Sequence, residues 1–122
     1  MRRTILILYL VVHPHPFLCA GAPPRSVKEL KAFYAANCAK CHGADGSARN
    51  PEGKHLPSTD FTDTLNMAKK SDAMMVKTIR KGIFFGVVMH PFKKRITEAE
   101  ALVLVREVLR KAERGKVIAP GE

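Results

Sequence analysis

The segment Cys38–His42, with the sequence CAKCH, constrains this chain more than any other part of it. It places two thiols three positions apart and an imidazole directly after the second thiol. Zinc sites, thiol–disulfide redox pairs and covalent haem attachment all use such residues. A zinc site usually needs a second pair of ligands, and a thioredoxin-like redox pair is expected among alternating strands and helices. The sequence offers neither context, which leaves haem attachment.

Covalent haem attachment agrees with the rest of the chain. The C-x-x-C-H pattern predicts that Cys38 and Cys41 each bond one vinyl group and that His42 lies over the iron. The stretch 43–64 is rich in Gly, Pro, Asn, Asp, Ser and Thr and predicts a long loop, which is unusual unless it wraps something. The chain has no Trp, so its core looks thin for its size. We therefore predict one covalent haem c with its iron.

The first residues predict export. Two arginines precede the apolar run 5–12, and small residues follow it near Ala20 and Ala22, as in a secretory signal peptide. The run is too short to cross a bilayer, which takes ~20 apolar residues. We predict a signal peptide over residues 1–22, which takes Cys19 with it, and a mature domain over residues 23–122. Cleavage after Ala20 is the alternative. The expected location is the periplasm, because c-type haem is attached outside the cytoplasm.

Three segments predict helices. A capping box at Ser26 opens the first, whose apolar stripe recurs every three or four positions and reaches both thiols: Val27, Leu30, Tyr34, Cys38 and Cys41. Ser71 begins the second helix and Gly82 ends it. The third helix starts with a capping box at Thr97 and extends to Ala112. Helices, irregular loops and no sheet are expected, hence an all-α fold.

The segment 82–92, GIFFGVVMHPF, has neither helical nor alternating rhythm. A buried strand is one interpretation, but we favour an apolar loop packed against an apolar group. Six side chains compete as the second axial ligand: Met67, Met74, Met75, Met89, His55 and His90. Met74 and Met75 lie on a predicted helix, where methionine usually fills the core. Met89 precedes His90-Pro91, where the proline favours extended backbone, so it is the preferred candidate.

At this point the sequence resembles the class I c-type cytochrome family, in particular its small bacterial monohaem members. The resemblance covers residues 27–112 and rests on FYAANCAKCHGADGS, TDFTD and MHPFKKRITEAE. It implies a cytochrome c-like fold of three to four helices with long loops around one haem. It also implies that Met89 is the axial ligand in a motif that ends with Phe92. The proline lies one place later than usual, which keeps His90 as a rival ligand.

The resemblance implies an electron carrier, not an enzyme, because His/Met ligation occupies both axial sites and leaves no place for a substrate. Two alternatives stay open. One is a haem subunit bound permanently to a larger oxidoreductase. The other is a haem sensor or peroxidase whose sixth site is labile.

Three further expectations come from the resemblance. The carbonyl of Pro57, or alternatively of Pro51, would accept the hydrogen bond that orients His42. The first and last helices would cross at Leu30, opposite Leu104 or Glu107. In place of the usual Trp or Tyr near a haem propionate, the candidates are Arg49, Lys54 and His55.

The chain is strongly basic, with 21 Lys and Arg against 11 Asp and Glu. By the resemblance, several of these bases surround the exposed haem edge as a cationic rim: Lys40, Lys81, Lys93, Lys94 and Arg95. Such a rim favours redox partner proteins with an acidic docking face, including a membrane-bound oxidase or dehydrogenase. Nucleic acid is not an expected partner, since no aromatic residues are interleaved with the bases and no nucleic-acid-binding fold is recognised.

Overall fold

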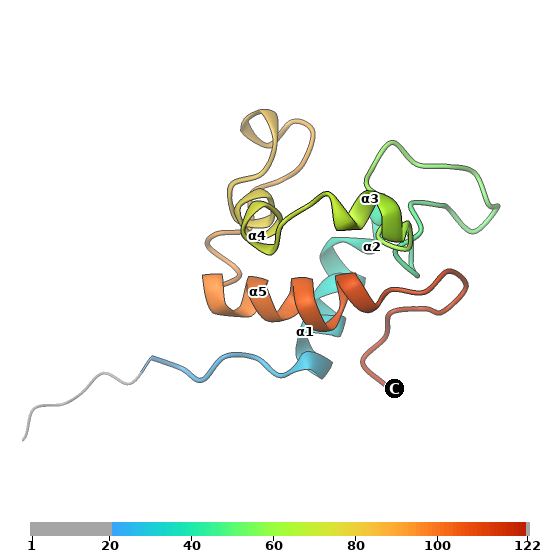
Figure 1. Cartoon of the computed structure of the whole chain (residues 1–122). Coiled ribbons are helices and arrows are strands. Elements are labelled where there is room, and N and C mark those ends of the chain that lie inside the picture. Colours follow the sequence, from blue (N-terminus) through green and yellow to red (C-terminus); the bar gives the residue numbers. More distant parts are fainter. Residues whose placement is uncertain (1–20, 122) are drawn as a thin grey trace, which may run out of the picture.

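The computed structural model describes residues 21–121, so the predicted signal peptide lies outside the described residues except for Gly21 and Ala22. This part of the chain is helical, with two isolated bridges and no strands, which confirms the all-α prediction. None of the helices within it is long and apolar enough to cross a membrane. The elements, labelled in part in Figure 1, are α1 Val27–Asn37, α2 Ala39–His42, α3 Thr64–Ala68, α4 Asp72–Lys81, the 3₁₀ turn η1 Phe84–Gly86, α5 Glu98–Glu107 and the 3₁₀ turn η2 Leu109–Lys111.

The predicted helix starts are confirmed. The Ser26 hydroxyl accepts a hydrogen bond from the Glu29 backbone N–H at 3.3 Å, and the Glu29 carboxylate accepts from the Ser26 N–H at 2.7 Å. Thr97 forms the same capping box at the start of α5. Ser71 caps α4, and Gly82 ends it with a φ of 72°, where a side chain would be strained.

Three local features differ from the predictions. The first helix does not continue through both thiols, because α1 ends at Asn37 and Cys38, with φ −114°, lies between α1 and α2 as the cap of both. The third helix stops at Glu107, since Val108 has φ −120° and a 3₁₀ turn follows. The short helix α3 was not predicted, although Asp63 caps it through a 3.0 Å bond to the Asn66 N–H.

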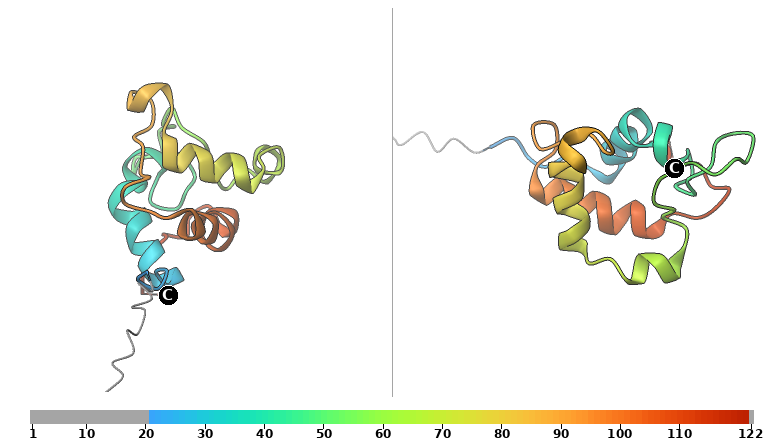
Figure 2. Two further views of the ribbon diagram at one scale, coloured as in Figure 1. Left: turned by 90° about the vertical axis from the view of Figure 1, so that its left-hand side faces the viewer. Right: turned by 90° about the horizontal axis from the view of Figure 1, so that it is seen from above.

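The core lies where α1 and α4 pack against α5, as the two views of Figure 2 show. Leu30 of α1 and Leu104 of α5 are both fully buried. Glu107, the other candidate for the crossing, has a side chain that is 43% exposed and pairs with Lys111. Both leucines therefore belong to the core that α1 and α5 share, and each such burial stabilises the fold by roughly 1.5–3 kcal/mol.

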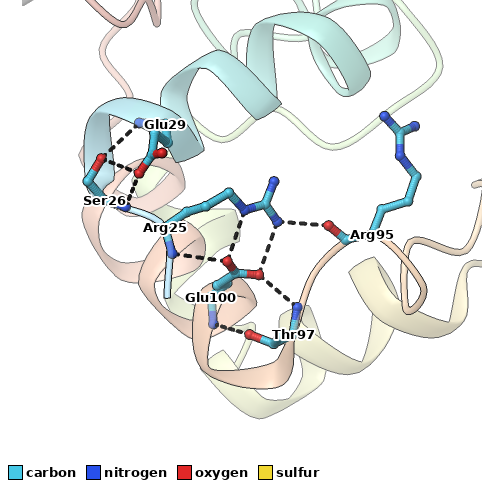
Figure 3. A network of polar contacts seen from close by, with 6 residues as sticks. All are labelled: Arg25, Ser26, Glu29, Arg95, Thr97 and Glu100. Carbon is cyan, nitrogen blue, oxygen red and sulfur yellow. Dashed lines mark hydrogen bonds and ion pairs between the residues drawn. The ribbon is translucent and has the colours of Figure 1, made fainter. Parts of the chain in front are cut away.

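A polar network ties the beginning of the domain to the start of α5 (Figure 3). Arg25 donates from Nε to the Glu100 carboxylate at 2.9 Å and from Nη2 to the Arg95 carbonyl at 2.8 Å. Glu100 also accepts from the Thr97 N–H at 2.9 Å. Its hydrogen bonds, first of all that from Arg25, hold the pKa of the buried Glu100 carboxyl well below its usual range. The network anchors the backbone that follows the segment 82–92.

Candidate functional site

A cavity of about 780 Å³ opens between α2, α4 and two loops, which contribute residues from 56–61 and 83–92. Its volume lies within the ~300–1,000 Å³ typical of small-molecule and cofactor sites. Much of its wall is apolar, including side chains from α4 and α5. The structure brings every predicted site residue and the rival histidine to this wall: Cys38, Cys41, His42, Pro57, Met89, His90 and Phe92.

His42 is oriented by a backbone carbonyl. Its Nδ1 lies 3.0 Å from the Thr59 carbonyl oxygen. Because a carbonyl only accepts, Nδ1 carries the hydrogen and Nε2 of the neutral ring keeps its lone pair for a metal. Burial lowers the pKa of His42, which favours this neutral form. The prediction that the Pro57 carbonyl accepts this hydrogen bond is wrong, because the acceptor is the Thr59 carbonyl, two residues further along the chain. The chain bends between them, where the Ser58 N–H donates to the Leu56 carbonyl. Pro57 itself lines the cavity.

An aromatic residue that the sequence analysis did not single out supports the same histidine. Phe61 stacks on the His42 ring with a centroid distance of 4.6 Å and an interplanar angle of 21°. It also lines the cavity and lies edge-on to Tyr34. Phe61 lies in the stretch TDFTD, which the sequence analysis used as a family motif without giving its aromatic residue a role. This motif was the one sequence feature that could have indicated Phe61.

The turn after His42 is fixed by close backbone contacts. Gly43 has φ 82°, and a Cβ at this position would lie 2.9 Å from the Arg49 carbonyl oxygen. The Ala48 N–H donates to the His42 carbonyl at 2.8 Å. From α1, the fully buried Tyr34 donates a hydrogen bond from its hydroxyl to the Gly43 carbonyl at 2.8 Å. Only glycine fits this turn, which holds the imidazole at a set angle to the cavity.

The two thiols differ in exposure. Cys38 is partly buried and Cys41 is exposed, and the structure describes both as free cysteines. Burial, with a smaller contribution from Cys41, raises the pKa of the Cys38 thiol to about 12. Thiol–disulfide redox pairs rely instead on a lowered pKa that supplies a thiolate. The Cys38 thiol therefore lacks the lowered pKa that such a redox pair relies on.

Met89 lies on a loop that is closed at its base. The Ile83 N–H donates to the Met89 carbonyl at 3.0 Å, and a Cβ on Gly82 would lie only 2.3 Å from that oxygen. Phe92 is buried, donates its N–H to the Ile79 carbonyl at 3.0 Å and meets Phe33 edge-on at 5.7 Å. These contacts hold the loop against α4, with Met89 partly buried at the cavity wall.

The rest of this loop departs from the prediction of an apolar loop packed against an apolar group. Ile83, Val88 and Met89 line the cavity, but Phe84 and Phe85 do not. Their side chains are 74% and 105% exposed. Both residues have positive φ, which turns the chain outward between Ile83 and Val88.

None of the residues suggested for a haem propionate lines the cavity. Arg49 instead donates to the Gly53 carbonyl at 2.9 Å and forms an isolated bridge with His55. The lysines that do line the cavity are Lys40, from the predicted rim, and Lys70, which the sequence analysis did not consider.

Comparison with known proteins decides the family. The profile described as "Cytochrome C oxidase, cbb3-type, subunit III" matches residues 25–106. The chain belongs to the class I c-type cytochrome family. The solved structure "KustC0563 c-type cytochrome" is 32% identical with a TM-score of 0.56, and the match covers 69% of this chain and 96% of that chain. A tyrosine-to-phenylalanine mutant of that cytochrome is 30% identical with a TM-score of 0.55, covering 69% and 98%. No curated protein matches this chain.

The residues of this cytochrome fit the cofactor that its family binds. A c-type cytochrome holds haem c covalently through thioether bonds, with iron at its centre. The residues that line the cavity include Cys38, Cys41, His42, whose Nε2 is free, and three methionines, Met74, Met75 and Met89. Bound there, haem c supplies one-electron redox chemistry. Of the six candidates for the second axial ligand, Met74, Met75, Met89 and His90 line the cavity, whereas Met67 and His55 do not, so the choice of Met89 stays a prediction.

Proposed function

We propose that this cytochrome is a periplasmic carrier of single electrons that holds one haem c. Cys38 and Cys41 tether the cofactor, and His42 and Met89 ligate its iron. The observation that carries the proposal is the setting of His42: the Thr59 carbonyl and the Phe61 ring fix a neutral imidazole beside the attachment cysteines. A thioether as second ligand raises the reduction potential relative to a second histidine. The chain's own role is to hold both ligands and to exclude water through its apolar wall.

The test uses the protein matured with haem. Mass spectrometry is expected to show one haem added to the polypeptide, with a new N-terminus after Ala22 or Ala20. The reduced protein should lose one electron to hexacyanoferrate(III) and regain it from ascorbate without loss of absorbance. More than one haem, or a spectrum that does not return on reduction, would contradict a reversible monohaem carrier.

The second candidate function is that of a haem subunit bound permanently to an oxidase complex. It is favoured by the description of the matching family, which is subunit III of cbb3-type cytochrome c oxidases. Gel filtration of the protein from gently solubilised native membranes separates the two candidates. Elution as a free small protein supports the carrier, and co-elution with an oxidase supports the subunit.

Partners of opposite charge are part of the proposal. The exposed bases of the predicted rim flank both the attachment motif and the segment with Met89: Lys40, Lys81, Lys93, Lys94 and Arg95. They would attract an acidic docking face at long range, so association should weaken as ionic strength rises. Changing Lys93, Lys94 and Arg95 to Glu is expected to slow the reduction of an acidic partner at low salt. An unchanged rate would reject the rim.

A further inference from the structure

The turn between Ile83 and Val88, called here the phenylalanine finger (residues 83–88), projects from the helical body between α4 and α5. It is the gold segment in Figures 1 and 2, and Figure 1 and the left view of Figure 2 show it extending beyond its neighbours. Its outermost side chains are apolar: Phe84 is 74%, Phe85 105% and Val87 87% exposed. None of these three lines the cavity, so a cofactor bound there leaves them exposed.

The finger is an ordered turn. The N–H groups of Gly86 and Val87 donate to the carbonyls of Ile83 and Phe84, at 3.2 and 3.0 Å. Phe84 and Phe85 have φ values of 49° and 54°, in a region that bulky side chains rarely adopt. Strained backbone of this kind clusters at functional positions such as active sites, ligand clamps and switch regions. Here the strain points both aromatic side chains away from the body.

Charge identifies the partner that fits this finger. Between residues 73 and 97 the sequence contains no Asp or Glu. The basic residues of this stretch are Lys77, Arg80, Lys81, Lys93, Lys94 and Arg95, and all of them except Arg80 are exposed. The Lys93 N–H donates to the Arg80 carbonyl at 3.0 Å, so the two chain segments that carry these bases meet at the base of the finger. A second copy would place like charges against each other, whereas an acidic surface would be attracted.

We propose that the phenylalanine finger docks into an apolar recess of a redox protein whose rim carries Asp and Glu. The inference rests on the proposed electron-carrier function and adds the site and chemistry of its partner. A protein fits better than a lipid bilayer because the finger shares Ile83 and Val88 with the cavity wall. Docking there brings a partner's redox centre beside the cofactor, while a bilayer at the same place would cover that side of the cavity.

The test measures electron transfer from the reduced, haem-loaded protein to an acidic cupredoxin, whose apolar copper edge adjoins a patch of carboxylates. The variant is Phe84→Ser with Phe85→Ser. The control is Leu65→Ser, since Leu65 is 79% exposed on α3, far from the finger in sequence. Truncating central apolar contacts commonly costs an interface a factor of about ten or more. We expect the double variant to lose that factor in the second-order rate constant, and the control to match wild type.

Two companion measurements give readouts besides the rate. In an NMR titration with both proteins reduced, so that no net transfer occurs, the dissociation constant should rise by about tenfold in the double variant only. Oxidation by hexacyanoferrate(III), which needs no docking recess, should proceed at the same rate in all three proteins. A wild type that fails this reaction would reject the proposed carrier function itself.

Two results would overturn the docking proposal while the carrier function stands. One is an unchanged rate and affinity for the cupredoxin in the double variant. The other is binding to phosphatidylcholine–phosphatidylglycerol vesicles at moderate salt that wild type shows and the double variant loses, which would assign the finger to a lipid surface. Equal vesicle binding by both proteins would leave a protein recess as the occupant.

Discussion

The two sides of the cavity are built differently. The attachment corner (residues 38–43) is held by the polypeptide itself: Thr59 and Phe61 orient His42, and Tyr34 supports Gly43. The methionine loop (residues 82–92) is anchored at its base and beyond its end, while its middle displays strained, exposed aromatic residues. The difference teaches that the fold itself positions His42, whereas the proposed second ligand, Met89, is carried on a loop that also faces outward.

The largest expected effect comes from the attachment corner. Changing both Cys38 and Cys41 to Ser should abolish covalent haem, because no thioether bond can form. Haem staining of a denaturing gel measures this directly. Cys41→Ser alone should leave single-bond attachment through Cys38. Full haem staining of the double variant would contradict the assignment of the site.

A glycine pair tests how rigid the corner is. Gly43→Ala should lower the free energy of unfolding by about 2–3 kcal/mol, because it combines strain at positive φ with a Cβ 2.9 Å from the Arg49 carbonyl. Gly53 is the matched control: its φ is 79°, but nothing lies within 4 Å of an added Cβ. Gly53→Ala should cost only about 1 kcal/mol. Equal losses in urea unfolding would mean that the close contact at Gly43 is unimportant.

The network beyond the methionine loop gives an intermediate effect. Glu100→Gln should cost about 2 kcal/mol, because a buried carboxylate that binds Arg25 loses its charge. Glu98→Gln is the control on the same helix, since the Glu98 side chain is 78% exposed and its surface pair with Arg80 is worth less than ~1 kcal/mol.

The same network predicts a pH dependence. The pKa of Glu100 is lowered in the folded state, so its contribution is complete above the ordinary carboxyl pKa of 4.5 and declines as the pH falls toward the folded value. The stability difference between wild type and Glu100→Gln should therefore shrink below about pH 4.5. A difference that grows on acidification would show that the sign is wrong.

The smallest effect is expected in the finger. Phe85→Gly should change the free energy of unfolding by less than about 1 kcal/mol, because relief of strain at positive φ offsets the greater freedom of glycine in the unfolded chain. Thermal unfolding of the haem-loaded protein measures it. A large loss would show that the Phe85 side chain stabilises the fold, contrary to its full exposure.

Sequence patterns predicted the parts of this molecule that depend on local rules. The caps at Ser26, Ser71 and Thr97 were predictable because each bond joins residues three positions apart. The family motifs also predicted that the attachment residues and Met89 share one site, and the structure places all of them on one cavity wall.

What escaped prediction depends on tertiary geometry. The acceptor for His42 is the Thr59 carbonyl and not that of Pro57, and backbone carbonyls carry no residue signature. The stack of Phe61 on His42 joins residues on opposite sides of a loop. The outward turn at Phe85 follows from φ values that no pattern of apolar residues encodes.

The central claim is that His42 and Met89 both ligate the iron of an electron carrier. It is tested most directly by optical titration of the reduced, haem-loaded protein with carbon monoxide. We predict no spectral change for wild type and for His90→Ala, and ready CO binding by Met89→Ala, because only that variant opens the sixth position. CO binding by the wild type, or by His90→Ala but not Met89→Ala, would contradict the account.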